Sequence, residues 1–373
     1  MRFLFVSNYY DDVPCGGRNL ARTHYAALNE ACGHEGVLLS TLSEFHTRQD
    51  LPGKISVMCA RNKLQKLANL LGGRIQGFSA EAERVILSEA LTGKYSFVWF
   101  DDRIYGSAIQ ALKQKAPNLR LYTFYHTVYS SGKIRFHSLG QYWKDKNLIR
   151  HEGLAAKFSD VNVVLNDRER RIFTGRYGRD CLVMPICLED TAELIPEKVP
   201  SQRKNEPFRI LFVGGGKHSP NVQGVRWFAR EVMPLLDERA EFWIVGTYMD
   251  RLAGEFSGDS RIFVRGRADD LGEYYRSADV VVGPIFSGGG MMTKTTEALM
   301  WGKNYLATGH ALTGYEGLED CRCGTAQEFA DRINAMIAAR PAKYSPEMRR
   351  LYEEKYSLSA MTKMFREIVT GVK

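Results

Sequence analysis

The chain has 373 residues, of which 44% are hydrophobic and 25% charged, and its formal net charge is +8. This length exceeds one ordinary hydrophobic core, so we expect two domains. No stretch approaches the roughly 20 apolar residues of a membrane-spanning helix, and the first residues lack the basic start and cleavage site of a signal peptide. We therefore exclude an integral membrane protein and expect a cytoplasmic one.

The cysteines and the net charge indicate which kinds of site and partner to expect. Seven scattered cysteines are an odd number, which argues against a disulfide framework, and the Cys321-x-Cys323 spacing is used neither by zinc ribbons nor by redox motifs. The positive charge favours anionic partners. Because basic and acidic residues alternate and no nucleic-acid-binding motif accompanies them, we expect no nucleic-acid partner.

The first half alternates short apolar runs with longer amphipathic ones, which is typical of a parallel sheet covered by helices. After the first predicted strand, Gly16, Gly17 and Arg18 stand directly before a helical run over Asn19–Ala31. Backbone N–H groups at such a strand-to-helix turn can face a ligand. The expected strands are Phe3–Val6, Gly36–Leu39, Ile55–Met58, Phe97–Phe100, Leu119–Phe124 and Val161–Leu165.

Polar residues follow two of these strands. Asp101, Asp102 and Arg103 come after the fourth strand and are interpreted first as surface charge. The two adjacent aspartates lack the Asp-x-Asp spacing of a known metal-binding motif, so no metal site is expected. His126 ends the fifth strand at the edge of the sheet, where neighbouring groups alone can account for it. Glu152 is expected to open a helix, where a helix-terminal salt bridge is one interpretation.

Apolar periodicity disappears between Ile195 and Pro207 and then restarts, which indicates a linker followed by a second doubly wound domain. Open sheets of this kind bind ligands beyond the carboxyl ends of their strands. The predicted fold is therefore α/β, with two Rossmann-like domains facing a central cleft. The predicted domains are 1–195, a linker at 196–207, 208–355, and a C-terminal helix within 356–373 that packs back on the first domain; the second domain's strands are Phe208–Val213, Glu241–Val245, Ile262–Val264, Val280–Val282 and Tyr305–Ala307.

The stretch from Pro284 to Lys303 carries the strongest chemical signal. Gly288, Gly289 and Gly290 follow a predicted strand and precede a helix that bears Lys294 and Glu297. Glycines let backbone N–H groups approach a phosphate, and a helix start adds about half a positive charge. Lys294 and Glu297 are three residues apart and share one helical face. A flexible surface loop is the alternative explanation for the glycines alone.

This stretch resembles the nucleotide-sugar signature of glycosyltransferase family four, the group 1 glycosyl transferases, in which a Gly-rich loop precedes a Lys-x-x-Glu-Ala helix and a Gly-Lys turn. Further similarity lies in Phe212-Val213-Gly214, Pro220-Asn221-Val222, Ala278-Asp279-Val280 and Gly314-Tyr315-Glu316-Gly317. The resemblance covers most of residues 207–320 and is sparse in the first half. It implies the GT-B fold and a retaining transfer of a hexose-type sugar from a nucleotide-sugar, with a UDP-sugar favoured over a GDP-sugar.

The resemblance also implies roles for individual residues. Glu297 would accept hydrogen bonds from the nucleotide ribose, and Lys294 would steady the diphosphate, as would Lys217 in the turn after Phe208–Val213. His126 would lie over the donor sugar, while Asp102 and Glu152 would line the acceptor side. The remaining predicted nucleotide-sugar contacts are Gly16, Gly17, Arg18, Gly215, Gly216, Arg267, Gly288, Gly289, Gly290, Met291 and Thr293.

One departure from the family pattern concerns the mechanism. Many members place a second glutamate eight positions before the Glu-Ala pair, and this chain has Gly289 there. Same-face attack, in which the leaving phosphate takes the acceptor proton, needs no protein nucleophile. We expect no cofactor and no metal. The expected acceptor is a saccharide or lipid-linked saccharide, as in cell-surface polysaccharide synthesis, and a lipid-linked acceptor would give the positive charge a use at the inner membrane face.

Two other functions stay open at this point. A catalytically idle paralogue of the same fold would act as a partner subunit, and an isomerase of the same fold would ionise and re-add the nucleotide on one sugar. The isomerase needs an acidic group where Gly289 stands. A nicotinamide dehydrogenase is disfavoured because Gly214-Gly215-Gly216 lacks the Gly-x-Gly-x-x-Gly spacing.

Overall fold

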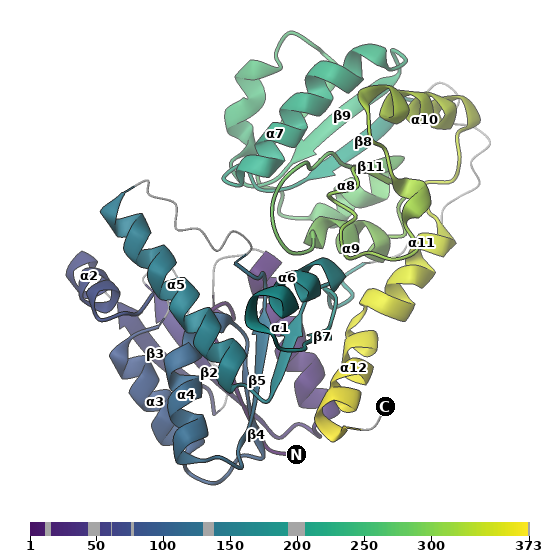
Figure 1. Cartoon of the computed structure of the whole chain (residues 1–373). Coiled ribbons are helices and arrows are strands. Elements are labelled where there is room, and N and C mark those ends of the chain that lie inside the picture. The colour runs from purple at the N-terminus through teal and green to yellow at the C-terminus, as the bar shows by residue number, and fades with distance from the viewer. Residues whose placement is uncertain are drawn as a thin grey trace. The chain divides into compact units, whose positions relative to one another are not determined.

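The computed structural model describes residues 1–11, 16–43, 53–60, 62–75, 78–129, 138–192 and 206–371. The chain divides into two compact units, Met1–Cys187 with Leu358–Lys373, and Leu188–Ser357 (Figure 1). The first unit thus ends at Cys187 and not at residue 195, because the Leu188 N–H donates to the Tyr356 carbonyl at 2.9 Å within the second unit. The predicted linker at 196–207 lies largely outside the described residues.

The first unit contains a seven-stranded parallel sheet in the order β3-β2-β1-β4-β5-β6-β7. The chain reverses its direction of travel across the sheet between β1 and β4, which makes this pair the topological switch point. Each strand expected from the sequence is present, and the two-residue β7 was not expected. The strands are β1 (Phe3–Ser7), β2 (Gly36–Ser43), β3 (Ile55–Ala60), β4 (Phe97–Phe100), β5 (Arg120–Tyr125), β6 (Val161–Val164) and β7 (Leu182–Val183).

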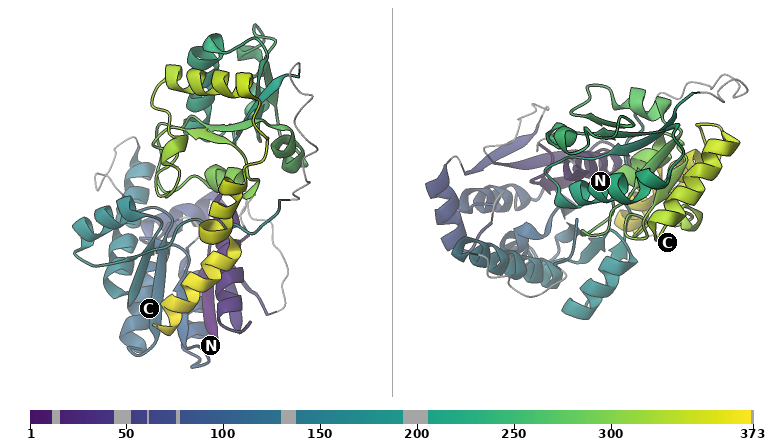
Figure 2. Two further views of the ribbon diagram at one scale, coloured as in Figure 1. Left: turned by 90° about the vertical axis from the view of Figure 1, so that its right-hand side faces the viewer. Right: turned by 90° about the horizontal axis from the view of Figure 1, so that it is seen from above.

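Helices cover both faces of this sheet. They form because amphipathic segments alternate with the strands, and several begin at a side-chain cap, such as Ser79, whose hydroxyl accepts from the Ala82 N–H. In Figure 2, α12 runs beside α1, in agreement with the packing of these two helices. The helices are α1 (Gly16–Ala31), α2 (Lys63–Leu71), α3 (Ala80–Ala90), α4 (Gly106–Lys115), α5 (Leu139–Phe158), α6 (Asp167–Tyr177) and α12 (Leu358–Thr370).

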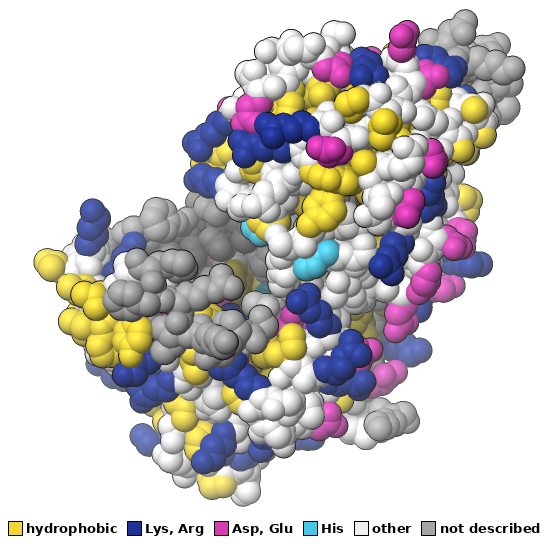
Figure 3. All heavy atoms as spheres, turned by 45° about the horizontal axis from the view of Figure 1, so that its top comes forward, with side chains coloured by type: hydrophobic (Ala, Val, Ile, Leu, Met, Phe, Trp, Pro, Cys, Tyr) yellow, Lys and Arg dark blue, Asp and Glu magenta, His cyan; other side chains and the backbone are white. Residues whose placement is uncertain are grey.

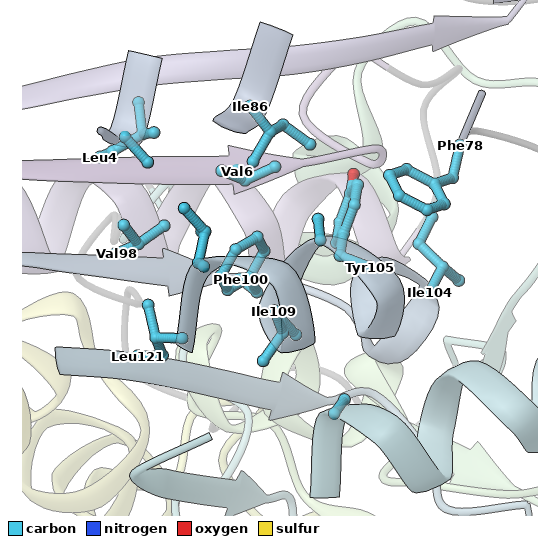
Figure 4. Packing of buried hydrophobic residues seen from close by; sticks show 14 of the residues in the cluster. Leu4, Val6, Phe78, Ile86, Val98, Phe100, Ile104, Tyr105, Ile109 and Leu121 are labelled. Carbon is cyan, nitrogen blue, oxygen red and sulfur yellow. The ribbon is translucent and has the colours of Figure 1, made fainter. Parts of the chain in front are cut away.

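The two faces of the sheet carry different side chains, since successive strand residues point to opposite faces. One face is mainly aliphatic: Val6 of β1 and Val98 of β4 pack with Ile86 of α3 and Ile109 of α4 (Figure 4). This cluster is buried, so the strands are fixed in register by its apolar contacts. Both faces being covered explains why the strands are continuous apolar runs in the sequence.

The opposite face of the same sheet is aromatic. Phe3 stacks on Phe97 with ring centroids 5.3 Å apart, and Trp99 meets Phe365 of α12 edge to face at 5.0 Å. Buried aromatic pairs of this geometry add about 0.5–1.5 kcal/mol each beyond the burial of their surface. The C-terminal helix is therefore anchored in the core of the first unit by Phe365.

The second unit has a five-stranded parallel sheet in the order β10-β9-β8-β11-β12, with its switch point between β8 and β11. Phe228 packs against Phe242 of β9 at 4.6 Å between ring centroids. The strands are β8 (Phe208–Val213), β9 (Ala240–Val245), β10 (Ile262–Arg265), β11 (Val280–Gly283) and β12 (Tyr305–Ala307). The helices are α7 (Ser219–Trp227), α8 (Leu271–Ser277), α9 (Thr293–Met300), α10 (Ala326–Ala339) and α11 (Pro346–Leu351).

Among the helices of the described residues, none combines the length and the apolar character that a bilayer crossing requires.

Candidate functional site

The strongest candidate site lies at the switch point of the second unit. β8 and β11 are neighbours there and run parallel. The turn Gly214–Gly216 follows β8, and the loop that begins at Pro284 leads from β11 to α9. Because the carboxyl ends of parallel strands meet at one edge of the sheet, the two predicted phosphate-binding segments are brought to the same place.

Asn221, in the first turns of α7, joins these two segments. The Lys294 ammonium donates to the Asn221 Oδ1 at 2.6 Å, and the Asn221 amide donates to the Gly215 carbonyl at 3.0 Å. Asn221 is itself buried, so its two hydrogen bonds fix the ammonium group beside the glycine turn. Lys294 of α9 and the glycine turn after β8 are therefore connected through Asn221 by hydrogen bonds.

The surroundings of Lys294 make its charge costly in the absence of an anion. Burial lowers the pKa of Lys294 to about 7, and the nearby Glu297 acts in the opposite direction. The ammonium also lies 4.4 Å from the centroid of the Phe212 ring. A bound anion would replace the lost hydration and favour the protonated state. This arrangement is that of a lysine prepared for a negatively charged ligand.

Glu297 lies one turn further along α9. Tyr275 of α8 donates its hydroxyl proton to the Glu297 Oε2 at 3.2 Å, and the Tyr275 ring stacks on Trp301 with centroids 5.6 Å apart. Burial raises the pKa of Glu297, while Tyr275 and Lys294 act to lower it. A carboxylate oriented by one hydrogen bond keeps acceptor capacity for a pair of ligand hydroxyls.

Close contacts require glycine at two of the three positions of the turn Gly214–Gly216. A Cβ on Gly216 would lie 2.4 Å from the Tyr248 carbonyl oxygen, and one on Gly214 would lie 2.8 Å from the Asn221 Nδ2. At Gly215 the nearest atom would be the Thr247 Oγ1 at 3.5 Å, an ordinary contact. The sequence therefore needs glycine at the two outer positions of the turn to bring its backbone against its neighbours.

The second glycine loop leads into α9. Gly288 and Gly290 adopt φ values of +130° and +70°, which side chains rarely tolerate. Gly288 and Gly289 are exposed, whereas Met291 is buried and Thr293, the first residue of α9, is half-buried. Among the described residues, the Met292 side chain makes no cap hydrogen bond at the start of α9, and the Thr295 N–H donates to the Met292 carbonyl oxygen at 2.9 Å. The N–H groups that precede Thr295 belong to a helix start, which can face an anion.

Two predicted basic contacts have different surroundings. Lys217 is exposed, and its ammonium lies 4.0 Å from the centroid of the Tyr248 ring, next to the glycine turn. Arg267 is also exposed, with its Nε 4.0 Å from the Asp269 Oδ1. The structure thus brings Lys217 beside the turn, and Gly266, which precedes Arg267, accepts from the Gly246 N–H at 3.0 Å.

The first unit has a second polar cluster, again at its switch point. His126 follows β5, and its Nε2 lies 2.9 Å from the Asp101 carbonyl oxygen. Its ring is 4.6 Å from that of Tyr9, which follows β1. Gly17 also packs against this tyrosine, because a Cβ on Gly17 would lie 3.0 Å from the Tyr9 ring. The predicted residues Gly17 and His126 are thus joined through a tyrosine.

Arg18 and its glycines occupy the first turn of α1. The helix starts at Gly16, and Gly16, Gly17 and Arg18 are all half-buried. They lie inside the helix start and not before it, where the sequence placed them. The backbone N–H groups of this turn remain those of a helix N-terminus.

The prediction that Asp101 is a surface charge was wrong, because this residue is buried. Its carboxylate is fully buried between two histidines, with the His24 Nδ1 at 2.7 Å from Oδ1 and the His126 Nε2 at 3.6 Å from Oδ2. Burial acts to raise the pKa of Asp101, but His24 and His126 outweigh it and hold the pKa at about 2. Burial lowers the pKa of His24 despite Asp101, whereas Asp101 overcomes burial and raises the pKa of His126.

Asp102 and Glu152 are buried as well, and they hold the same arginine. The Arg103 Nε lies 2.9 Å from the Glu152 Oε2 in an ion pair, and the Arg103 Nη1 lies 3.9 Å from the Asp102 Oδ1. Glu152 also accepts from the Tyr129 N–H at 3.0 Å and the Tyr177 hydroxyl at 2.5 Å. Burial raises the pKa of both carboxyl groups, and Arg103 acts to lower them.

The position predicted for Glu152 was wrong. It lies in the middle of α5, which starts at Leu139, and not at a helix start. The reason is that Ser138 caps the helix much earlier, by accepting from the Gln141 N–H at 3.2 Å. In the structure Glu152 serves as a buried acceptor that fixes the segment around Tyr129.

Three residues of these clusters escaped the sequence reasoning as site residues. Asn221 had a readable signal, since a polar residue directly after a glycine turn and at a helix start is well placed to contact both. His24 and Tyr275 had none, because each lies within a helix and its partner, Asp101 or Glu297, is far along the chain. Within the described residues, no three His, Cys, Asp or Glu side chains gather as metal ligands.

The family follows from the segment that carries the first cluster. Residues 207–339 match the family model described as glycosyl transferases group 1, and this range contains the glycine turn, Asn221, Lys294 and Glu297. This segment of the second unit is therefore similar to a group 1 glycosyl transferase. A comparison with curated proteins by sequence gives no match.

Solved structures extend the likeness beyond residues 207–339. HepE of Anabaena in complex with UDP is similar with a TM-score of 0.71 and 14% identity, covering 100% of both chains. The sucrose-phosphate synthase of Thermosynechococcus elongatus has a TM-score of 0.70 at 15% identity, covering 100% of this chain and 98% of that one. The lipopolysaccharide outer core galactosyltransferase WaaB has 0.66 at 12%, covering 100% and 99%. These likenesses confirm the predicted GT-B fold class of two Rossmann-like domains.

Proposed function

We propose that this group 1 chain transfers a hexose-type sugar, with retention, from a nucleotide-sugar to a saccharide or lipid-linked saccharide. A UDP-sugar is favoured over a GDP-sugar. The observation that carries the proposal is the contact of Lys294 with Asn221 and of Asn221 with Gly215, at the switch point of a group 1 domain. HepE, solved with UDP and with UDP-glucose, and WaaB, named as a galactosyltransferase, support the donor class.

The second unit would hold the leaving group. Lys294 would bind the diphosphate, together with the N–H groups of the glycine turn and of the α9 start and with Lys217 at its edge. Glu297 would accept from the ribose hydroxyls. Preorganised cations and N–H groups of this kind stabilise the negative charge that develops as the nucleoside diphosphate departs. Asn221 thus fixes the Lys294 ammonium, which would stabilise the charge of the leaving group.

The proposed reaction needs no protein nucleophile. The bond between the anomeric carbon and the β-phosphate oxygen breaks, and the acceptor oxygen forms its bond on the same face of the sugar. The acceptor proton passes to the departing phosphate oxygen, which gives a nucleoside diphosphate and a retained glycoside. Gly289, at the position of the second glutamate of many members, offers no carboxylate, and this route does not require one.

The first unit would act on the sugar and the acceptor. His126, held by Asp101, would donate a hydrogen bond to the donor sugar, and Arg18 would assist the phosphate. The buried Asp102 and Glu152 would shape the acceptor side through Arg103, which both of them hold. We propose no cofactor or metal, a cytoplasmic location with a peripheral membrane contact, and a role in polysaccharide synthesis.

A binding experiment followed by a transfer assay tests this proposal. UDP is expected to raise the melting temperature more than GDP, by mass action. Glu297→Ala should abolish the UDP-dependent rise in melting temperature and the turnover of radiolabelled UDP-sugars. Glu273 is an exposed glutamate on the neighbouring α8, and Glu273→Ala should leave both intact. Full activity of Glu297→Ala would overturn the ribose contact.

The same assay separates the other two functions. Only a transferase yields a new radiolabelled glycoside. An isomerase would return an altered nucleotide-sugar, and an idle paralogue would give neither product. Either of those outcomes, obtained with a donor that binds, would contradict the proposed transfer.

A further inference from the structure

Tyr248 of the second unit has an unusual backbone conformation. Its φ is +64°, in the left-handed region that bulky side chains rarely adopt. Among the described residues, two others that are not glycine share this conformation, His34 and Arg340. Both close a helix: the His34 N–H donates to the Asn29 carbonyl oxygen at 2.7 Å, and the Arg340 N–H to the Met336 carbonyl oxygen at 2.8 Å. Left-handed residues commonly end helices in this way.

Tyr248 differs from these two residues because it follows a strand. It lies three residues after the end of β9 and directly before the 3₁₀ helix η4 (Met249–Glu255). Its side chain is 42% exposed, whereas the next residue, Met249, is fully buried. A strained residue persists where its surroundings hold it, and such residues cluster at functional sites. The conformation of Tyr248 therefore requires an explanation other than a helix end.

The glycine turn Gly214–Gly216 is part of the surroundings of Tyr248. The Tyr248 carbonyl oxygen lies close to where a Cβ of Gly216 would stand, and the Gly214 carbonyl oxygen lies close to where a Cβ of Gly246 would stand. The turns after β8 and after β9 thus pack backbone against backbone. Because β8 and β9 are parallel neighbours, both turns lie at the carboxyl edge of the sheet, where open sheets bind ligands.

The ring of Tyr248 lies beside two positive charges. The Lys217 ammonium is 4.0 Å from the ring centroid, and the Arg251 guanidinium carbon is 4.7 Å from it. The negative face of an aromatic ring attracts a cation at this distance, which is worth about twofold to fivefold in an equilibrium constant at an exposed site. Positive side chains are visible on the surface of the second unit in Figure 3, and the two named here follow β8 and β9.

The contact with the ring matters for Lys217 because this residue is exposed and begins directly after the glycine turn. Ordering a long, exposed side chain on a ligand has an entropic cost. The ring of Tyr248 restricts the Lys217 side chain in advance to a position beside the turn. The strained backbone of Tyr248 in turn places the ring there, while Met249 is buried beneath it.

We propose that Tyr248 is a positioning residue, which holds the Lys217 ammonium beside the glycine turn so that it meets the diphosphate of the donor. This inference rests on the proposed function, in which Lys217 binds that diphosphate, and it adds a residue that acts through Lys217. Direct contact of the ring with the nucleotide is the alternative. The two differ in whether the effects of Tyr248 and Lys217 on affinity are coupled.

Calorimetric titration of the full chain with UDP tests the inference. Tyr248→Ala should bind UDP about two to five times more weakly than the wild type, because the cation–π contact is lost. Tyr248→Phe keeps the ring and should bind UDP more tightly than Tyr248→Ala. Lys217→Gln should weaken binding by up to about fivefold, and adding Tyr248→Ala to it should cause no further loss. The control Lys157→Gln removes an exposed lysine that lies 5.3 Å from the Phe158 ring in the first unit, and it should bind UDP as the wild type does.

Two measurements without nucleotide test the contact and the strain. Interaction with Lys217 lowers the pKa of Tyr248, so Lys217→Gln should raise this pKa, as followed by NMR titration of the tyrosine rings. Tyr248→Gly should melt about 1–4 °C higher than Tyr248→Ala, because glycine adopts a positive φ without strain. An unchanged pKa of Tyr248 would contradict the contact, and equal melting temperatures of the two variants would contradict the strain.

Three affinity results would overturn the inference: equal UDP affinity of Tyr248→Ala and the wild type, tighter binding by Tyr248→Ala, or losses from Tyr248→Ala and Lys217→Gln that add in the double variant. The proposed function is read out separately, by formation of a radiolabelled glycoside. If the wild type transfers sugar but the two residues are not coupled, the failure belongs to the positioning of Lys217. If the coupling is present but no glycoside forms, the failure belongs to the proposed function.

Discussion

Lys294 makes donor binding depend on pH in a way that the structure defines. In the ligand-free protein, burial lowers the pKa of Lys294 to about 7. A diphosphate binds best to the protonated ammonium, and its charge raises the pKa in the complex. Below pH 7 the ammonium is already protonated and affinity is constant. Above pH 7 binding must take up a proton, so affinity for a UDP-sugar should fall about tenfold per pH unit until the pKa of the complex is reached.

The assay is calorimetric titration of UDP-glucose between pH 6 and pH 9, with proton uptake obtained from buffers of different ionisation enthalpy. UDP-glucose is preferred to UDP because its two phosphates do not titrate in this range. Lys294→Arg keeps a charge that does not titrate and should give a flat profile. Lys294→Gln should bind about 10 to 100 times more weakly, as expected for a lost charged hydrogen bond of about 1.5–3 kcal/mol, also without a slope. A flat profile for the wild type, or a slope that persists in Lys294→Gln, would refute this reasoning.

Three further predictions follow from other contacts. Asn221→Ala removes the acceptor that holds the Lys294 ammonium at 2.6 Å and should weaken UDP binding about tenfold. Asn221→Asp keeps an acceptor and should bind UDP more tightly than the alanine variant. Equal UDP affinities of the two variants would argue against a role of Asn221 in positioning Lys294. Gly216→Ala should lower the free energy of unfolding by about 1–3 kcal/mol and Gly215→Ala by much less, because their Cβ atoms would meet neighbours at 2.4 and 3.5 Å; denaturant unfolding measures both. Asp101→Asn should lower the pKa of His126, which Asp101 raises, as followed by NMR titration of the ring protons, and an unchanged pKa would contradict the pairing.

The pairing of Asp101 also sets a pH window for stability. Its folded pKa of about 2 lies below the ordinary value of 3.8, so the stability it contributes is present above pH 4 and is lost as the pH falls through 2. The raised pKa of His126 acts in the other direction. Its contribution is complete below the ordinary pKa of 6.5 and is lost as the pH rises through the folded value.

The sequence was sufficient for the strands and for the fold class. Runs such as Phe97–Phe100 are apolar throughout because helices cover both faces of a parallel sheet. The glycines after β8 mark a turn with close contacts, and Gly288 and Gly290 after β11 mark a loop with positive φ. These signals are local in the sequence. They placed Gly214–Gly216 after one strand and Lys294 on the helix after another; the structure shows that these strands are neighbours and joins the two segments through Asn221.

The contacts that required the structure join residues far apart in the chain. Asp101 reads as a surface charge until His24, 77 residues away, is placed beside it. Glu152 reads as a helix-terminal residue until Arg103 and Tyr177 are placed beside it. The boundary at Cys187 depends on Leu188 pairing with the segment at Tyr356. Nothing in the local pattern specifies any of these partners.

The most direct test of the central claim is a crystal structure of the chain with UDP. The proposed function predicts the diphosphate within hydrogen-bonding distance of the Lys294 ammonium and of the N–H groups at Gly214–Gly216, and the ribose hydroxyls on the Glu297 carboxylate. A nucleotide bound elsewhere, with Lys294 still held only by Asn221, would contradict it.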